Sequence, residues 1–99
     1  MTWTEQDIRG VWEKGEVVGN LNAAKWRKDA CGAWMSRDQH GNHNSNFGWE
    51  IDHILPVAEG GGNALSNLRP LQWKNAGADR KGGALICLVT AYGGENIDR

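Results

Sequence analysis

The 99-residue sequence has only two prolines, two cysteines, one tyrosine and one phenylalanine, and it lacks any long apolar run. A transmembrane helix needs roughly 20 apolar residues in succession, and nothing in this sequence approaches that length. Residues 1–7 have neither the basic start nor the apolar core of a signal peptide. These absences argue against a membrane protein and a secreted precursor, and we predict a cytoplasmic protein.

The two cysteines, Cys31 and Cys87, lie far apart, and neither belongs to a Cys-x-x-Cys pair. This spacing argues against a four-cysteine zinc scaffold. A reducing cytoplasm favours two free thiols, with a disulfide between Cys31 and Cys87 as the alternative.

The sequence also lacks a strong excess of either charge, since the formal net charge is −1. Residues 20–82 contain eight basic and six acidic side chains (8 − 6 = +2), whereas the flanks contain three basic and six acidic ones (3 − 6 = −3). The acidity therefore lies outside the central segment. We expect only modest non-specific affinity for a polyanion.

With 39% hydrophobic and 23% charged residues, the composition is typical of one globular domain over residues 1–99. Helices are predicted from the capping residue Thr4 to Gly15, over 23–30 and over 73–81, and strands over 33–37, 49–54, 68–72 and 84–91. The last apolar run is also short enough for a buried helix. This pattern predicts an α+β fold.

The most informative stretch is residues 48–82, in which an acid–histidine pair precedes a glycine-bearing loop and two asparagines. Its spaced residues are Asp52, His53, Ile54, Pro56, Gly61, Gly62, Asn67, Leu68, Leu71 and Asn75. This pattern resembles the HNH motif of the ββα-metal endonucleases, and the surrounding sequence resembles small bacterial and phage HNH proteins. The resemblance implies a ββα-metal core, a hairpin plus a helix, with flanking helices and additional short strands.

The adjacent Asp52 and His53 fit the chemistry of phosphodiester hydrolysis. A neutral imidazole at position 53 can accept the proton of an attacking water. The Asp52 carboxylate and the Asn75 amide offer the oxygen ligands that Mg²⁺ or Mn²⁺ prefers. The resemblance assigns Asp52 and Asn75 to one divalent ion and gives Asn67 the task of holding the loop beside His53. The alternatives are a structural strand histidine, an Asp–Arg salt bridge at Asp52 and an ordinary turn residue at Asn67.

The helical end of the motif departs from related proteins, because Ala76 stands where they have a second asparagine. If residues 73–81 form a helix, Asp79 lies one turn after Asn75 and can assist it as a ligand. The alternative is an ion pair between Asp79 and a neighbouring cation. Glu50 shares a strand face with Asp52 and is expected to orient a ligand or a basic side chain, with an ordinary exposed ion pair as the alternative.

Several basic side chains around the motif are candidates for phosphate contacts that position nucleic acid without reading its sequence. They are Lys25, Arg27, Lys28, Arg69, Lys74, Arg80 and Lys81. Each of them is equally compatible with a solvated surface. His40 and His43 lie in a polar loop and are interpreted as loop residues or as a substrate-contacting edge.

The resemblance implies a metal-dependent DNA endonuclease that nicks double-stranded DNA with low sequence specificity, leaving a 5′-phosphate and a 3′-hydroxyl. A monomer or a weak homodimer is expected. The alternative is a catalytically weak HNH-like module that binds nucleic acid within a phage or repair assembly.

Overall fold

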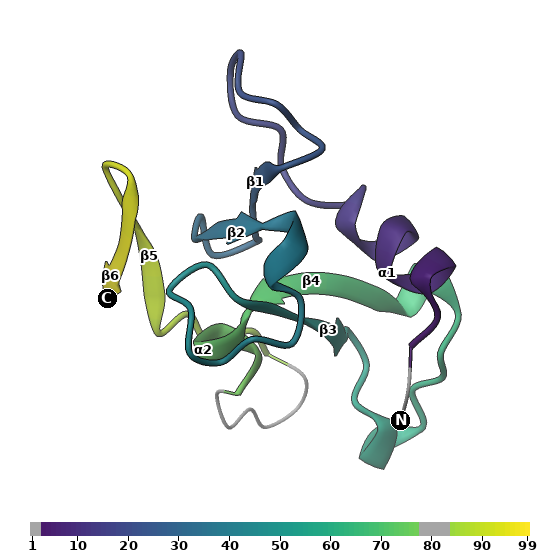
Figure 1. The fold of residues 1–99 in the computed structure, drawn as a ribbon. Helices are drawn as coiled ribbons and strands as arrows, with labels where there is room; N and C mark the ends of the chain where they lie inside the picture. The colour runs from purple at the N-terminus through teal and green to yellow at the C-terminus, as the bar shows by residue number, and fades with distance from the viewer. Residues whose placement is uncertain (1–2, 78–83) are drawn as a thin grey trace.

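A computed structural model describes residues 3–77 and 84–99. The centre of the molecule is an antiparallel pair of strands, β3 (Trp49–His53) and β4 (Leu68–Gln72) (Figure 1). Trp49 lies opposite Gln72, and His53 lies opposite Leu68. Both strands were predicted, and both are confirmed within one residue. Because the side chain of Trp49 is fully buried, this end of the pair is anchored in the core.

The helix α1 (Glu5–Trp12) packs beside β4 and supplies one wall of the core. The predicted start is confirmed, since the Thr4 hydroxyl accepts a hydrogen bond from Asp7 N and the Asp7 carboxylate accepts one from Thr4 N, both 3.0 Å long. The helix ends at Trp12, three residues before Gly15. The core cluster consists of Val11, Trp12, Met35, Trp49, Ile51 and Leu68.

The helix predicted over residues 23–30 is wrong, because this segment contains the strand β1 (Trp26–Lys28), which pairs with β2 (Trp34–Ser36). The Asn22 side chain accepts a hydrogen bond from Ala24 N, which closes a local turn rather than a helix N-terminus. The ring of Trp26 then packs edge-on against Phe47, 5.1 Å away. Tertiary contacts of the aromatic ring therefore override local helix propensity.

The buried carboxylate of Asp29 joins three parts of the fold. Its Oδ1 accepts hydrogen bonds from Cys31 N and Ala33 N, and its Oδ2 accepts hydrogen bonds from Gln72 N and from the side-chain amide of Asn75. These four bonds, from 2.8 to 3.0 Å long, connect the β1–β2 turn to the end of β4 and the residues after it. Each oxygen of this buried carboxylate accepts two hydrogen bonds, so its polar atoms are satisfied inside the fold.

The C-terminal hairpin consists of β5 (Val89–Tyr92) and β6 (Glu95–Asp98), with Gly93 in the left-handed region at φ +59°. The predicted strand over residues 84–91 is therefore confirmed only from Val89 onward. The strand β6 was not predicted, because Glu, Asn and Asp are depleted in strands.

The expectation of two free thiols is wrong, because Cys31 and Cys87 form a disulfide with a Cα–Cα distance of 5.5 Å. The bond joins the β1–β2 turn to the segment before β5. Beside it, the Thr90 hydroxyl donates a hydrogen bond to the Cys31 carbonyl. The cytoplasmic location that suggested free thiols stays a prediction.

A single helical turn, α2 (Trp73–Ala76), follows β4 directly. The predicted order of strand, loop, strand and helix is therefore present, and the fold is α+β. The helix was predicted to continue to residue 81, but it ends at Ala76 with Gly77 as its C-cap, and residues 78–81, including Asp79, Arg80 and Lys81, lie outside the described residues. No helix among residues 3–77 and 84–99 has the length and apolar character that crossing a bilayer requires.

Candidate active site

A cleft of about 420 Å³ opens where β3 meets α2 and the loop that follows β3. Its wall includes the side chains of His43, Glu50, Asp52, His53, Trp73 and Ala76. The structure thus brings the acid–histidine pair of the motif to one cleft together with a loop histidine. Asn75 does not line it.

His53 stands at the end of β3, where a residue of the following loop binds its ring. Its Nε2 lies 2.7 Å from Asn63 Oδ1. An amide oxygen only accepts hydrogen bonds, so Nε2 is the donor of this bond. The bond fixes the orientation of the ring, and His53 lines the cleft. Sequence reasoning missed Asn63, although its place directly after three glycines could have marked it as the polar tip of the loop.

Asn67 ties both ends of this loop together with its side chain. Its Oδ1 accepts a hydrogen bond from Leu55 N at 2.8 Å, and its Nδ2 donates to the carbonyls of Leu55 and Gly62 at 3.1 and 2.8 Å. The loop also passes very close to itself, since a Cβ on Gly61 would lie 1.7 Å from the Leu55 carbonyl oxygen. Asn67 and Gly61 therefore hold the loop that presents Asn63 to His53.

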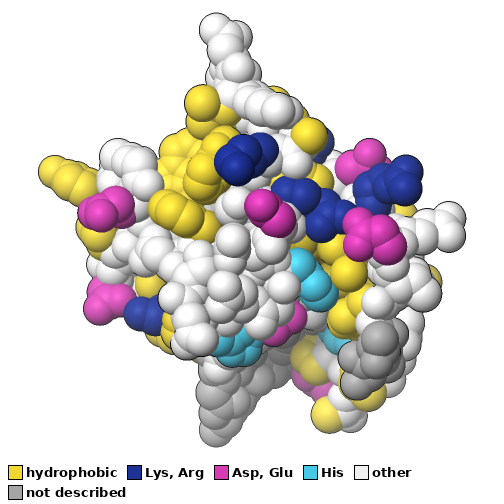
Figure 2. All heavy atoms as spheres, in the orientation of Figure 1, with side chains coloured by type: hydrophobic (Ala, Val, Ile, Leu, Met, Phe, Trp, Pro, Cys, Tyr) yellow, Lys and Arg dark blue, Asp and Glu magenta, His cyan; other side chains and the backbone are white. Residues whose placement is uncertain are grey.

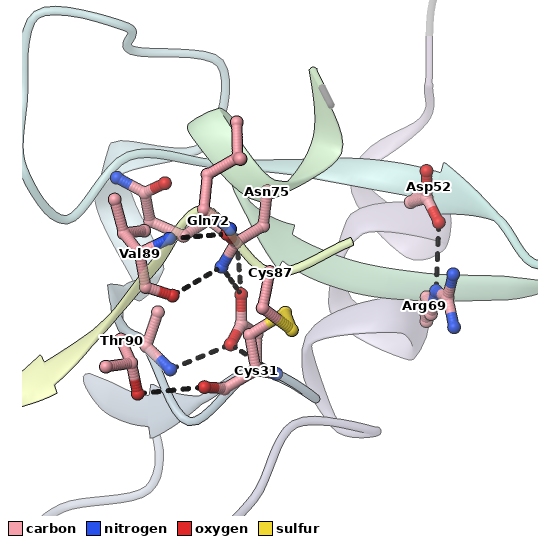
Figure 3. The surroundings of a disulfide bond; sticks show 11 residues. Cys31, Asp52, Arg69, Gln72, Asn75, Cys87, Val89 and Thr90 are labelled. Carbon is pink, nitrogen blue, oxygen red and sulfur yellow. Dashed lines mark hydrogen bonds and ion pairs between the residues drawn. A yellow bond between two sulfur atoms is a disulfide. The ribbon is translucent and has the colours of Figure 1, made fainter. Parts of the chain in front are cut away.

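Asp52 is 7% exposed and forms an ion pair with Arg69, directly opposite it on β4. Arg69 Nε donates to Asp52 Oδ2 at 2.9 Å (Figure 3). The Asp–Arg salt bridge that was the alternative for Asp52 is therefore present. Only Nε of the guanidinium forms this bond, and Nη2 is buried without a hydrogen-bond partner among the described residues, so the phosphate contact of Arg69 stays a prediction.

Asn75 is fully buried and has a structural role. Its Oδ1 accepts hydrogen bonds from Leu88 N and Val89 N, and its Nδ2 donates to Asp29 Oδ2 and to the Val89 carbonyl (Figure 3). Figure 3 also shows Asn75 beside the disulfide, well separated from Asp52. We therefore withdraw Asn75 as a metal ligand, since its amide is occupied and does not reach the cleft.

The next residue, Ala76, lines the cleft together with Trp73, the first residue of α2. Its methyl group has no donor or acceptor, so this helical turn supplies no ligand beside Asp52. Within the described residues, no three His, Cys, Asp or Glu side chains converge closely enough to hold a metal ion. Asp79, the predicted assistant of Asn75, lies outside those residues.

Glu50 pairs with the polar loop rather than with a ligand of the motif. Its Oε2 lies 2.6 Å from His43 Nε2, and its Oε1 lies 3.8 Å from His40 Nε2. The ring of His43 also stacks on Trp73, with centroids 5.1 Å apart and an interplanar angle of 10°. The pairing and the stacking together place His43 on the wall of the cleft, which agrees with the interpretation of this loop as an edge of the site.

His40 packs edge-on against the ring of Trp49, and its Nε2 is buried without a hydrogen-bond partner among the described residues. Burial lowers the pKa of His40 below its ordinary value, because a charged imidazole loses its hydration there. The negative charge of Glu50 opposes this effect to a smaller extent. The fold therefore favours neutral His40.

The predicted basic contacts have different surroundings. Arg27 donates to the backbone carbonyls of Glu13, Gly15 and Ala23, so it has a structural role and we withdraw it as a phosphate contact. Lys25, Lys28 and Lys74 each lie over the ring of a tryptophan. Arg80 and Lys81 fall outside the described residues.

Comparison with known proteins found no matching family model, curated protein or solved structure. The assignment of the cleft therefore depends on its own residues and on the motif that they form.

Proposed function

We propose that the chain is a metal-dependent DNA endonuclease of the HNH type, hydrolysing phosphodiester bonds at the cleft between β3 and α2. The observation that supports this most directly is the contact between His53 and Asn63. Nε2 of His53 donates to Asn63 Oδ1, which orients the ring, and Asp52 lines the same cleft. A fixed base beside a carboxylate is what hydrolysis by an activated water requires.

In the proposed reaction, Nδ1 of His53 takes a proton from the water whose oxygen attacks phosphorus. The Nε2–H···Asn63 hydrogen bond keeps the ring oriented and stabilises the imidazolium that forms. The bond from phosphorus to the 3′-oxygen breaks, and that oxygen takes a proton from solvent. The products are the 5′-phosphate and 3′-hydroxyl that the resemblance implies.

The residues fit a weakly held Mg²⁺ or Mn²⁺ ion rather than a tightly bound one. Asp52 would hold such an ion, which would supply positive charge to the phosphoryl group and to the leaving oxygen. Mg²⁺ often binds through one or two carboxylates, several waters and substrate phosphates, so a single carboxylate is a sufficient protein ligand. Because Arg69 also binds Asp52 Oδ2, we expect low metal affinity in the absence of DNA.

A second candidate function is supported by the composition of α2. Because Asn75 is buried and Ala76 faces the cleft, the helix offers no oxygen or nitrogen ligand there. A protein with this site can bind nucleic acid through its surface and cleave it slowly or not at all. This is the catalytically weak HNH-like module of a phage or repair assembly.

Relaxation of supercoiled plasmid DNA separates the two functions. The wild type is compared in Mg²⁺, in Mn²⁺ and in a chelator, beside His53→Ala and, as a matched control, His43→Ala, which removes the other histidine of the cleft. For the nuclease we expect metal-dependent nicking that falls about 10²–10⁴-fold in His53→Ala, and much less in His43→Ala. DNA binding in a gel-shift assay without metal-dependent nicking supports the weak module. Equal nicking by His53→Ala and wild type removes His53 from the mechanism.

A further inference from the structure

A second, apolar pocket of about 220 Å³ lies apart from the cleft, on the face formed by β1, β2 and the turn between β5 and β6. It is lined by Leu21, Trp26, Trp34 and Gly94. Figure 2 shows hydrophobic side chains gathered on this face between the loop before β1 and the C-terminal hairpin, with a basic side chain at their edge. The side chain of Leu21 is 47% exposed, so the pocket is open to solvent.

The two indole rings of the pocket stand at 82° to each other with centroids 6.4 Å apart, and each has a lysine over it. Lys25 Nζ lies 5.8 Å from the ring centroid of Trp26, and Lys28 Nζ lies 4.7 Å from that of Trp34. Neither lysine forms an ion pair within the part of the chain that the structure describes. Apolar ring faces and cationic groups therefore lie side by side.

We propose that this pocket is a base-stacking site for single-stranded nucleic acid. A base has apolar faces that stack on an indole, and its phosphates lie close enough to pair with Lys25 and Lys28. The lining offers almost no polar surface to the edge of a base, so stacking there is tolerant of sequence. A peptide side chain could fill the apolar volume but would leave the two lysines without a partner. Charge complementarity therefore favours the nucleic acid.

The polar loop over residues 41–47 connects this pocket with the cleft. At one end His43 stacks on Trp73, and at the other Phe47 packs edge-on against Trp26 at 5.1 Å. Asn46 holds the loop to Asn96, accepting a hydrogen bond from its N at 2.9 Å. A strand bound in the pocket can thus continue over a fixed loop toward the cleft. The inference depends on the proposed function only in taking nucleic acid as the ligand.

The test measures binding of dye-labelled oligothymidylate by fluorescence anisotropy, in a chelator so that no cleavage occurs. Leu21→Glu places a negative charge in the lining of the pocket, and Val17→Glu places the same charge on the same loop outside the lining, where Val17 is 53% exposed. We expect Leu21→Glu to weaken binding about five- to 150-fold, as loss of one stacked base does. Val17→Glu should change it less than about threefold, because exposed charges are screened.

Two further measurements identify what the pocket recognises. The double variant Lys25→Gln, Lys28→Gln should reduce the slope of log affinity against log salt concentration by about 1.4, at about 0.7 for each phosphate contact on a single strand. An abasic oligonucleotide of the same length keeps its phosphates but has no base to stack. We expect wild type to bind it about five- to 150-fold more weakly than oligothymidylate and Leu21→Glu to bind both ligands alike.

Three results would overturn the stacking site. The first is an equal loss of affinity in Leu21→Glu and Val17→Glu, and the second is no measurable binding of oligothymidylate by wild type. The third is a concentration-dependent dimer, seen by analytical ultracentrifugation, that Leu21→Glu abolishes, since the occupant is then a second copy of the chain. Each of these results is compatible with metal-dependent plasmid nicking by the wild type, which is measured separately. Failure of this inference is therefore distinguishable from failure of the proposed function.

Discussion

Replacing Asn75 by aspartate separates a structural role of this side chain from a metal-binding role, because the two roles predict opposite outcomes. The new carboxylate keeps the oxygen that accepts hydrogen bonds from Leu88 N and Val89 N. Its second oxygen replaces the donor that lies 3.0 Å from Asp29 Oδ2 and 3.2 Å from the Val89 carbonyl. Three acceptors then meet without a hydrogen between them, and two carboxylates face each other in the interior.

The cost follows from the bonds that are lost and the charge that is buried. Two hydrogen bonds contribute about 0.5–1.5 kcal/mol each, and a buried charge left without its partner typically costs about 3–5 kcal/mol. We therefore expect Asn75→Asp to lower the free energy of unfolding by at least about 3 kcal/mol. Small domains have only about 5–15 kcal/mol in total. At about 4–8 °C for each kcal/mol, the melting temperature should fall by at least about 12 °C.

Urea unfolding followed by tryptophan fluorescence measures this loss, and calorimetric titration with Mn²⁺ measures metal affinity at a temperature where the variant is folded. Asn75→Ala is the control, since it also loses the hydrogen bonds but adds no charge, and it should be destabilised less than Asn75→Asp. A variant Asn75→Asp that is as stable as wild type and binds Mn²⁺ more tightly would refute the structural role. In that case Asn75 would reach the ion, and its burial in the fold would be wrong.

The remaining predictions concern the cleft, the disulfide and the buried histidine. Ala76→His adds an imidazole to the cleft and should raise Mn²⁺ affinity in calorimetry at least about tenfold, equivalent to about 1.4 kcal/mol; unchanged affinity would mean that position 76 does not face the ion. Asn63→Ala removes the hydrogen bond that orients the ring of His53 and should lower kcat about 10–100-fold with little change in KM, whereas a change in KM alone would point to a substrate-binding role. Because the disulfide encloses a sequence separation of 56 residues, its replacement by Cys31→Ser with Cys87→Ser should cost about 4 kcal/mol in urea unfolding, and a loss below about 1 kcal/mol would contradict this. Burial lowers the pKa of His40, so as the pH falls through about 6.5 the unfolded chain binds a proton before the folded protein does, and stability decreases. In the nearly isosteric His40→Phe variant, this part of the decrease should be absent when urea unfolding is measured at different pH values. Identical pH profiles of wild type and variant would exclude His40 as its source.

The parts of the fold that follow from the sequence are those fixed by neighbouring residues. The start of α1 depends on Thr4 and Asp7, which are three residues apart and bond to each other. The strands β3 and β4 depend on apolar and β-branched residues with a glycine-bearing loop between them. Signals of this kind are contained within one element, so the sequence predicts them without knowledge of the partner.

Other parts could not be predicted, because distant residues determine them. β1 depends on the contact of Trp26 with Phe47, and the turn after it depends on Asp29, whose carboxylate accepts the Gln72 N–H from 43 residues away. The disulfide likewise joins segments that no local pattern relates. In the candidate site, Asp52 and His53 could be identified because they are consecutive in the sequence. Asn63 could not, because it contacts His53 only after Asn67 has closed the loop.

The incorrect assignment of Asn75 has a geometric origin that also bears on the chemistry of the cleft. Successive helical residues are rotated by about 100° around the axis, so residues 75 and 76 cannot both face Asp52. The sequence does not fix this rotation, but the hydrogen bonds of Asn75 with Asp29 and with the segment at Leu88 and Val89 do. They turn Asn75 into the interior and leave position 76 at the cleft. Folding thus depends on Asn75, whereas Ala76 occupies the position from which α2 could offer a metal ligand. A substitution at position 76 can therefore change metal binding with little effect on stability.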